Sequence, residues 1–217
     1  MHALRPDASL APSPRLVLGS TSPYRRELLA RLGLPFDVAS PEVDEHPLPA
    51  EAPLQTALRL ATLKARAVAA RCPDDAVVIG SDQVADLDGM ILGKPGDHAR
   101  AKAQLQAMRG QTVRFHTAVC VKRATTGFEQ TQVSTVSVRF RALSDLFIDT
   151  YLRLEHPYDC AGSAKCEGLG IVLLERIDSD DPTALVGLPL ILTTGLLQGA
   201  GLDVLAQLGR LAQTCQT

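Results

Sequence analysis

Residues 76–95 read AVVIGSDQVADLDGMILGKP and carry the clearest fold signal in the chain. The apolar, β-branched run at 76–80 predicts a buried strand that delivers Asp82 at its carboxyl end. Asp88 and Gly89 then predict a type I′ hairpin turn, because both residue types tolerate a positive φ. Open α/β sheets place ligand chemistry at the carboxyl ends of strands, so Asp82 is the first candidate for a functional residue.

Helices and strands alternate on both sides of this segment. Further strands are expected at residues 16–19, 36–40, 113–123, 128–141 and 168–177. Helices are expected at residues 23–32, 53–71, 97–109, 144–154 and 189–200, the last of these being the final helix. This alternation predicts an α/β fold in which a mixed sheet is flanked by helices. No internal repeat or low-complexity linker divides the chain, so residues 16–217 are expected to form one domain after a flexible extension at 1–15.

The composition excludes several classes of protein. With 217 residues, of which 46% are hydrophobic, the chain can bury a sizeable core. The formal net charge is −2, aromatic residues make up 4%, and there is no tryptophan. A general nucleic-acid binder would be strongly basic or would carry aromatic stacking platforms, so no nucleic-acid polymer is expected as a partner. Any site for an anion must therefore come from a local cluster of basic residues, because the chain as a whole is not positively charged.

Several features favour the cytoplasm and argue against a membrane. The cysteines are odd in number and widely spaced, without a CxxC pair, which predicts reduced thiols; they are Cys72, Cys120, Cys160, Cys166 and Cys215. The N-terminus does not show the basic and apolar regions of a signal peptide. The uncharged run at 184–202 approaches the length of a membrane span, but its proline and four glycines favour a buried loop followed by an amphipathic helix.

The run STSPYRR at residues 20–26 begins the first expected helix. Ser22 can serve as its N-cap, and Pro23 suits the first helical position. Free N–H groups at such a start attract phosphate, and Arg25 and Arg26 would add charged donors. An ordinary capped helix with solvated arginines would have the same sequence. Cations at a helix N-terminus oppose the helix dipole, however, unless an anion is bound there.

Acidic and basic residues elsewhere suit metal-assisted phosphate chemistry. Asp82 can polarise water or hold a divalent cation, although aspartate is also common in turns. The loop with Asp44 and Glu45 offers the few carboxylates that Mg²⁺ needs, while solvated loop charge would look the same. Lys64 and Lys94 stand among small or apolar neighbours, which predicts partly shielded ammonium groups that neutralise phosphates. These patterns select no reaction by themselves.

Several motifs occur together in one order along the chain. They are LGSTSPYRRELLARLG, PEVDE, LATLKA, IGSDQV, DG…LGKP, HTAV, CAGSAKCEGLG and VGLPL, from about residue 16 to residue 205. In order and spacing this set resembles the Maf-like family of nucleotide pyrophosphatases. The resemblance implies hydrolysis of a nucleoside triphosphate between its α and β phosphates, with a divalent metal cofactor such as Mg²⁺ or Mn²⁺. It also implies a fold like that of inosine triphosphate pyrophosphatases, an elongated mixed sheet in two lobes with a central cleft.

The resemblance assigns roles to matching positions of this chain. Asp82 matches the catalytic residue, the base that activates the attacking water. Phosphate contacts are assigned to Ser20, Arg25, Lys64 and Lys94. The acidic positions associated with the metal are Asp44, Glu45 and Asp82. Cations and a metal would neutralise the triphosphate while a carboxylate positions water in line with the α-phosphorus.

Three departures from the common family pattern resemble the branch that hydrolyses 7-methyl-GTP. Tyr24 stands where most members have arginine, Gln83 where they have threonine, and Glu167 where they have glutamine. N7-methylation makes the purine cationic, so the ring of Tyr24 can attract it by about 0.5–2 kcal/mol. A carboxylate at Glu167 can accept two hydrogen bonds from the N1–H and N2–H₂ edge of guanine, whereas glutamine accepts at one oxygen.

The expected activity is hydrolysis of 7-methyl-GTP to 7-methyl-GMP and pyrophosphate, which would remove a modified nucleotide from the pool. Two alternatives stay open. One is a pyrophosphatase for dTTP, UTP or another modified nucleotide. The other is a protein of division arrest that binds nucleotides without turnover. The expected partner is a small-molecule nucleotide, and the sequence leaves a homodimer open.

Overall fold

The computed structural model describes residues 14–214, so nearly all of the extension expected at 1–15 lies outside the described residues, as does Cys215. The first half of the chain forms β1 (Leu16–Gly19), α1 (Pro23–Ala30), β2 (Asp37–Ala39), α2 (Pro53–Ala69), β3 (Val77–Leu87), β4 (Met90–Leu92) and α3 (His98–Met108). The second half forms β5 (Thr112–Arg123), β6 (Phe128–Phe140), α4 (Asp145–Glu155), β7 (Leu174–Asp178), α5 (Leu190–Gly199) and α6 (Val204–Thr214). Short 3₁₀ turns are η1 (Ala124–Thr126), η2 (Ala161–Ser163), η3 (Leu169–Leu173) and η4 (Ala184–Val186).

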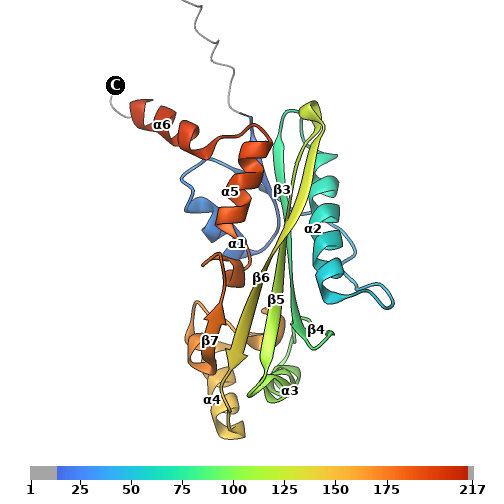
Figure 1. Ribbon diagram of the computed structural model, residues 1–217, viewed down its shortest axis with the longest axis vertical. Helices are drawn as coiled ribbons and strands as arrows, with labels where there is room; N and C mark the ends of the chain where they lie inside the picture. The colour runs from blue at the N-terminus through green and yellow to red at the C-terminus, as the bar shows by residue number, and fades with distance from the viewer. Residues whose placement is uncertain (1–13, 215–217) are drawn as a thin grey trace, which may run out of the picture.

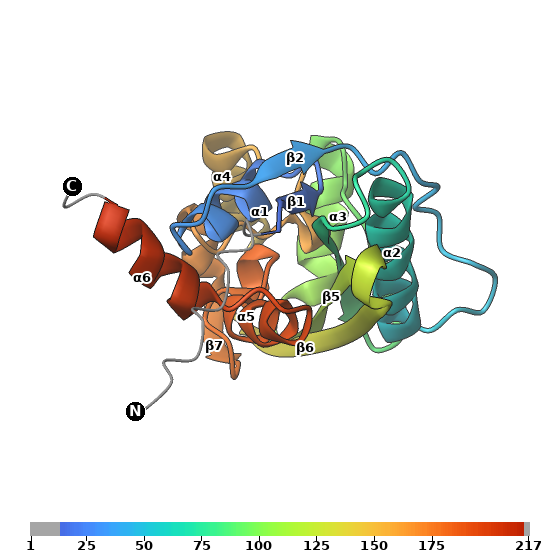
Figure 2. The same ribbon diagram turned by 90° about the horizontal axis from the view of Figure 1, so that it is seen from above.

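One mixed sheet organises the molecule. Within residues 14–214 it has seven strands in the order β2-β1-β3-β5-β6-β7, with β4 paired to β3 beside this path. β1 pairs in parallel with β2 and β3, and the other pairs are antiparallel. The long strands β3, β5 and β6 run through much of the length of the molecule (Figure 1). Helix α2 covers one face of the sheet, and α1 and α5 lie on the other (Figure 2). The predicted α/β fold with a mixed, helix-flanked sheet is confirmed.

Two large hydrophobic cores pack on the same face of the sheet, because alternate residues of a strand point to the same side. At one end, Ile79 and Val119 pack among apolar side chains of α1 and α5. At the other end, Ala85 and Phe115 pack among those of α3 and α4. The strands β3 and β5 pass through both cores, which gives the elongated arrangement of two lobes that the family resemblance implied. The single domain predicted for residues 16–217 stays a prediction.

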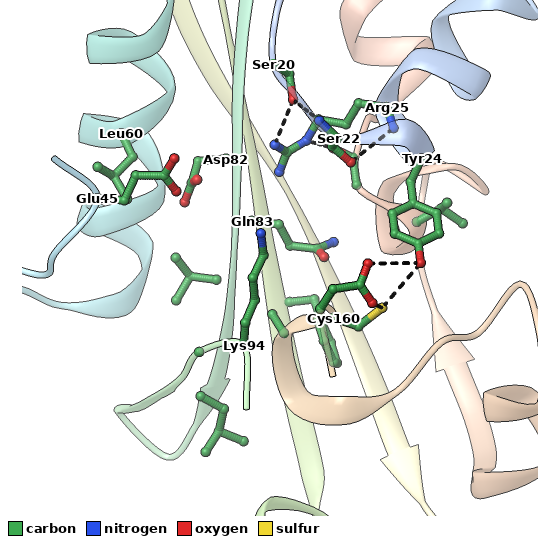
Figure 3. Close-up of a pocket in the computed structure, with 18 of the residues that line it drawn as sticks. Ser20, Ser22, Tyr24, Arg25, Glu45, Leu60, Asp82, Gln83, Lys94 and Cys160 are labelled. Atoms are coloured by element: carbon green, nitrogen blue, oxygen red, sulfur yellow. Dashed lines mark hydrogen bonds between the residues drawn. The ribbon is translucent and has the colours of Figure 1, made fainter. Parts of the chain in front are cut away.

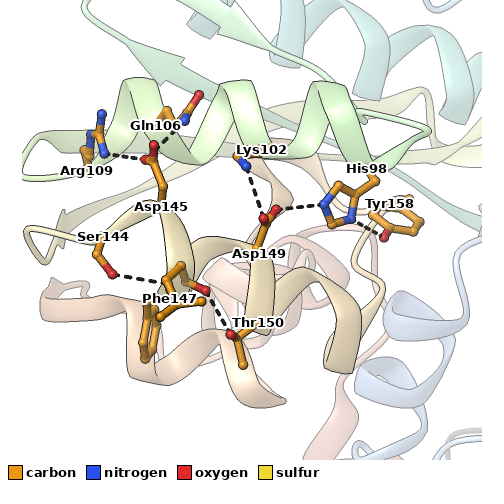
Figure 4. A network of polar contacts seen from close by, with 11 residues as sticks. His98, Lys102, Gln106, Arg109, Ser144, Asp145, Phe147, Asp149, Thr150 and Tyr158 are labelled. Carbon is orange, nitrogen blue, oxygen red and sulfur yellow. Dashed lines mark hydrogen bonds and ion pairs between the residues drawn. The ribbon is translucent and has the colours of Figure 1, made fainter.

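Helices α3 and α4 of the second lobe are joined by a network of polar side chains (Figure 4). Asp149 lies 3.0 Å from Nε2 of His98 and 3.2 Å from Nζ of Lys102. One turn away, Asp145 accepts a hydrogen bond from Arg109 at 2.8 Å. Exposed and half-exposed pairs of this kind contribute little stability each.

β3 is longer than the strand expected at 76–80. The parallel neighbour β1 does end there, since Gly19 pairs with Gly80. The antiparallel neighbour β5 continues, however, and pairs Asp82 with Ala118. Asp82 therefore lies inside a strand, and the expectation that it follows the end of a strand was wrong. It still lies directly beyond the point where parallel pairing stops.

The strand expected at 168–177 is confirmed only in its second half, as β7. Its first half forms η3, where the N–H groups of Gly168 and Gly170 donate to the carbonyl oxygen of Lys165 at 3.1 and 3.0 Å. A Cβ at Gly170 would lie 2.4 Å from that same oxygen, so glycine allows this close approach and other residues do not. An apolar run does not reveal such a constraint.

Helix α6 follows the range 189–200, which was expected to be the last helix, so that expectation was wrong. Val204 is buried and Leu208 packs against Gly33, but most of α6 is exposed and extends away from the sheet (Figure 2). In the described part of the chain no single helix is long and apolar enough to cross a membrane. α5 and α6 pass that test of length and composition only as a pair, bent by 87° at the break.

The closest approach of α2 to the sheet occurs at Gly80 of β3. A Cβ added there would lie 2.4 Å from the carbonyl oxygen of Ala61 and 2.4 Å from the backbone nitrogen of Ala65. These backbone atoms cannot move without shifting α2. We therefore expect Gly80→Ala to lower the free energy of unfolding by about 3 kcal/mol, at the upper end of typical overpacking costs. Calorimetry should show this as a fall in Tm of about 6–12 °C.

Gly195→Ala is the matched control for this prediction. Gly195 is exposed in α5, and a Cβ there meets no atom within 4 Å. Alanine favours helix over glycine, so a slight rise in Tm is expected. A Gly80→Ala protein as stable as the wild type would show that α2 is not held this close to β3.

Candidate functional site

A cavity of about 400 Å³ lies between the two lobes (Figure 3). This volume is in the range of sites for small molecules. Its wall combines the start of α1, the loop before α2, the middle of β3, the loop after β4 and segments near residues 160 and 186. All candidate site residues from the sequence line this cavity, with the exceptions of Asp44 and Arg26.

A buried lysine joins two carboxylates in the cavity. Nζ of Lys64 lies 2.7 Å from Oδ1 of Asp82 and 3.0 Å from Oε2 of Glu45. Lys64 is 4% exposed and Asp82 is 6% exposed, whereas Glu45 is largely open to solvent. Burial raises the pKa of Asp82, and the positive charges of Lys64 and Arg25 oppose that rise. Asp82 therefore accepts a proton more readily than an exposed carboxylate does, which suits a general base.

Helix α1 begins at the edge of the cavity and is capped as expected. Oγ of Ser22 accepts the N–H of Arg25 at 3.4 Å. The guanidinium of Arg25 donates from Nε to the carbonyl oxygen of Gly187 at 2.9 Å and from Nη1 to Oγ of Ser20 at 3.5 Å. Arg26 is exposed and lies outside this cavity. The segment is thus a capped helix in which one arginine faces the cavity and its neighbour faces solvent.

Arg25, Lys64 and Lys94 bring three positive charges to this part of the cavity, against the two carboxylates of Asp82 and Glu45. Burial lowers the pKa of Arg25, which Asp82 and Glu45 partly offset, and a guanidinium stays protonated at neutral pH. Lys94 points into the cavity from the loop after β4 (Figure 3). The partial shielding predicted for both lysines is confirmed for Lys64 and wrong for Lys94, which is exposed.

The wall formed by η4 is held by side chains of the sheet. Nε2 of Gln83 donates to the carbonyl oxygens of Ala184 and Leu185 at 3.1 and 3.0 Å. The carbonyl oxygen of Gly187 accepts the hydroxyl of Ser81 at 3.3 Å and orients Arg25 as described above. Gln83 was predicted as a residue of substrate selection, and the structure adds that its amide fixes this wall. Backbone carbonyls carry no side-chain signal, so the sequence did not reveal their part in the site.

The opposite part of the cavity holds the ring of Tyr24 (Figure 3), and the acidic residues Asp159 and Glu167 line the cavity near it. The hydroxyl of Tyr24 donates to Oδ2 of Asp159 at 3.4 Å, and Sγ of Cys160 lies 3.9 Å from the same hydroxyl. Burial first, and then the nearby Cys160, Asp159 and Glu167, raise the pKa of Tyr24. Asp159 and Cys160 were not predicted as site residues, although Cys160 begins the quoted motif CAGSAKCEGLG and Asp159 directly precedes it.

The ring of Tyr24 already has a cationic neighbour. Nζ of Lys165 lies 5.8 Å from the centre of that ring, a distance at which an ammonium group is attracted to an aromatic face. Lys165 is also paired with Glu155 at 3.1 Å. The environment of Tyr24 therefore favours positive charge next to the ring.

Two thiols, that of Cys160 in the cavity wall and that of Cys166 beside Glu167, are poorly suited to act as nucleophiles. Burial, followed by the charge of Asp159, raises the pKa of Cys160 to about 12. Burial, followed by the charge of Glu167, raises the pKa of Cys166 to about 12. Both thiols stay protonated at neutral pH, and the reactive form of cysteine is the thiolate.

The carboxylates of the cavity can hold a divalent cation. Glu45 and Asp82 both contact Nζ of Lys64, and Mg²⁺ is commonly held by one or two carboxylates together with substrate phosphates. Asp44 is largely exposed and bonds instead to Nδ1 of His46 at 2.6 Å, so its predicted metal role stays a prediction. Among residues 14–214, no group of three or more His, Cys, Asp or Glu is arranged to hold a metal ion.

Comparison with known proteins identifies the family. A family model described as Maf-like protein matches residues 15–200 of the chain. The chain belongs to this family. A Maf-like relative in Polaromonas sp. (strain JS666) is 65% identical over 93% of this chain and 92% of its own length, and it is named 7-methyl-GTP pyrophosphatase. Proteins with the same name are 64% identical in Albidiferax ferrireducens (88% of this chain, 96% of that protein) and 63% identical in Burkholderia pseudomallei (87% and 88%).

Two solved structures are distantly similar to this Maf-like chain. The Staphylococcus aureus Ham1 protein matches with a TM-score of 0.43 and 15% identity over 59% of this chain and 72% of that one. A nucleoside-triphosphatase, dITP/XTP pyrophosphatase, from Mycobacterium abscessus matches with a TM-score of 0.39 and 17% identity over 59% of this chain and 75% of that one. Both scores lie below 0.5, and the fold assignment rests on the sheet order given above.

Proposed function

We propose that this Maf-like chain hydrolyses 7-methyl-GTP to 7-methyl-GMP and pyrophosphate. The observation that carries the proposal is the opposite charge of the two ends of the cavity. Arg25, Lys64 and Lys94 line one end, where they outnumber the carboxylates of Asp82 and Glu45, and Tyr24, Asp159 and Glu167 line the other. A triphosphate is complementary to the first end and a cationic purine to the second. The names of relatives that are 63–65% identical support the same substrate.

Asp82 acts as the general base in this reaction. It takes a proton from water, whose oxygen attacks the α-phosphorus. The bond between the α-phosphorus and the oxygen that bridges to the β-phosphate then breaks, and pyrophosphate leaves with that electron pair. Lys64 and Arg25 neutralise the charge that develops on the phosphate oxygens. Asp82 finally releases its proton to solvent.

Glu45 and Asp82 are the residues that would hold the divalent cofactor, Mg²⁺ or Mn²⁺, with Asp44 as a further candidate on the same loop. When bound, such a cation neutralises phosphate charge and lowers the pKa of a bound water. The ammonium group of Lys64 contacts both carboxylates, so a bound cation would share them with Lys64.

Tyr24 and Glu167 select the base. The face of the Tyr24 ring attracts the cationic, N7-methylated purine. The carboxylate of Glu167 accepts the N1–H and N2–H₂ donors of guanine, and its negative charge is complementary to the same base. Asp159 adds a second negative charge next to the ring.

The test is pyrophosphate release from 7-methyl-GTP, GTP, UTP and dTTP, measured side by side with Mg²⁺ or Mn²⁺. We expect kcat/KM for 7-methyl-GTP to exceed that for GTP about tenfold, because a desolvated cation–π contact contributes up to about 2 kcal/mol. Faster turnover of UTP or dTTP would contradict the proposal and support the alternative of a dTTP/UTP pyrophosphatase. Binding of these nucleotides without any turnover would support the alternative of a division-arrest protein.

The proposed substrate also suggests where the protein acts. The nucleotide pool and a reducing environment for its free thiols are both found in the cytoplasm. With a net charge of −2, the chain is not expected to bind nucleic-acid polymers. No membrane partner is expected, and a homodimer stays a prediction.

A further inference from the structure

One side chain of α3 connects the two loops that carry the ends of the cavity. Gly93 and Lys94 line the phosphate end, and Glu167 belongs to a loop that starts at Ser163 and lines the base end. Nε2 of Gln104 donates to the carbonyl oxygen of Gly93 at 2.9 Å. Oε1 of the same side chain accepts a hydrogen bond from Oγ of Ser163 at 2.6 Å. The two arms of one amide thus end on the two loops.

Ser163 is held in a demanding conformation. It is fully buried and has a φ of +56°, in the left-handed region that residues other than glycine rarely adopt. Its carbonyl oxygen accepts the hydroxyl of Tyr151 at 3.2 Å, and that hydroxyl also accepts the N–H of Lys165 at 3.1 Å. Such a conformation persists only where the surroundings hold it in place. The bond to Gln104 is part of that support.

The loop of Lys94 is held at both of its ends. Gln104 binds it at Gly93, directly before Lys94. At Gly96 the backbone N–H donates to the carbonyl oxygen of Tyr158 at 3.0 Å, just before the segment that enters the base end. The exposed ammonium group of Lys94 is therefore carried by a loop whose backbone is fixed to the opposite side of the cavity.

We propose that Gln104 is a positioning residue that sets the distance between the phosphate end and the base end of the cavity. The naming of the two ends rests on the proposed function. An amide suits this task because it donates with its NH₂ group and accepts with its oxygen, so each loop is bound by a different chemical group. The side chain does not line the cavity and acts on the substrate only through Lys94 and Glu167.

Two variants each remove one of the two hydrogen bonds of Gln104. We call the bond to Gly93 the phosphate arm and the bond from Ser163 the base arm. Gln104→Glu still accepts the hydroxyl of Ser163 but presents an oxygen to the carbonyl oxygen of Gly93, so it breaks the phosphate arm. Ser163→Ala breaks the base arm and leaves the other intact. The probes are pyrophosphate and 7-methylguanosine, used separately as inhibitors of hydrolysis. We expect Gln104→Glu to weaken pyrophosphate inhibition about three- to tenfold and Ser163→Ala to weaken 7-methylguanosine inhibition by a similar factor. Each variant should leave the other probe within about twofold of the wild type.

Gln104→Ala breaks both arms and should weaken both probes. Gln106→Ala is its matched control, since Gln106 lies on the same helix and loses one hydrogen bond, to Asp145 at 3.2 Å, on the side toward α4 (Figure 4). The control should change neither inhibition constant. Equal effects of the two alanine variants would overturn the proposal, as would a Gln104→Glu or Ser163→Ala protein that weakens both probes or neither. Thermal unfolding of each variant shows that it is folded at the assay temperature.

Failure of this inference is distinguishable from failure of the proposed function. The substrate comparison on the wild type alone decides the function, and pyrophosphate reports on the phosphate arm whichever base is preferred. If the wild type prefers another nucleotide, the matching nucleoside replaces 7-methylguanosine. The same opposite effects of Gln104→Glu and Ser163→Ala are then required.

Discussion

Asp82→Asn is expected to lower kcat for hydrolysis of 7-methyl-GTP about 10²- to 10⁴-fold, the usual contribution of a general base. Asparagine keeps the size of aspartate and one oxygen, so it can still accept the hydrogen bond that Lys64 donates at 2.7 Å. A neutral amide cannot take a proton from water at neutral pH. Initial rates of pyrophosphate release at saturating substrate measure the effect.

A binding measurement shows whether Asp82 acts in catalysis or in binding the substrate. The Kd of 7-methyl-GTP, measured by calorimetry on Asp82→Asn, should change far less than kcat. Asp88→Asn is the control, because Asp88 lies in the exposed turn at the end of the same strand and Asn-Gly is a favoured pair there. Unchanged hydrolysis by Asp82→Asn would mean that another group is the base. A loss of binding as large as the loss of rate would mean that Asp82 holds the substrate.

The pH profile of kcat/KM gives an independent reading of the same residue. Burial raises the pKa of Asp82, so the acid limb of the wild type should lie at a higher pH than the pKa of an exposed aspartate. Below its own pKa Asp82 is protonated and cannot accept the proton of water, so the rate falls as pH decreases. In Asp82→Asn this limb should vanish, while limbs that come from the phosphates of the substrate stay.

Much of the fold was predictable because its signals are local. Ser22 and Ser144 each accept a backbone N–H three residues later, as an N-cap does, and the sequence placed helix starts at both. Asp88 and Gly89 have φ values of +49° and +89°, which agrees with the predicted type I′ turn. Each of these signals depends on a few consecutive letters, and distant parts of the chain do not override it.

The features that sequence reasoning missed depend on tertiary contacts. β3 continues past residue 80 because β5 pairs with it, and nothing in the strand itself shows which neighbour ends first. Asp159 entered the site through the hydroxyl of Tyr24, more than a hundred residues away. Arg25 is oriented by the backbone carbonyl of Gly187. Every residue type has such a carbonyl, so the sequence does not mark this one. The sequence motifs therefore predicted residues that line the cavity, but not the neighbouring groups that orient those residues.

Glu167→Gln is expected to lower kcat/KM for 7-methyl-GTP about 10- to 100-fold, since a hydrogen bond to a charged group contributes about 1.5–3 kcal/mol. Glutamine accepts at one oxygen and turns its own NH₂ toward a donor of the guanine edge. GTP loses the same hydrogen bond but not the attraction between a carboxylate and a cationic base. The ratio of kcat/KM for 7-methyl-GTP to that for GTP should therefore fall, as measured with both substrates side by side.

Glu27→Gln is the control for this change. Glu27 lies on α1 close to Tyr24 in sequence, is exposed, and pairs with Arg31 at 3.5 Å outside the cavity. It should leave both substrates unaffected. An unchanged ratio in Glu167→Gln would show that Glu167 does not contact the base.

The double variant Tyr24→Arg with Glu167→Gln tests both residues that are proposed to select the base. The double variant restores the residues common elsewhere in the family and exchanges an aromatic face and a carboxylate for a cation and an amide. A cationic base is then repelled at both positions, so preference should move toward UTP or dTTP. Tyr24→Phe separates the ring from its hydroxyl: it should keep most of the preference for 7-methyl-GTP, because the ring face provides the attraction and the bond to Asp159 does not. A Tyr24→Phe protein that loses the preference as fully as Tyr24→Arg would assign base selection to the hydroxyl and Asp159 instead.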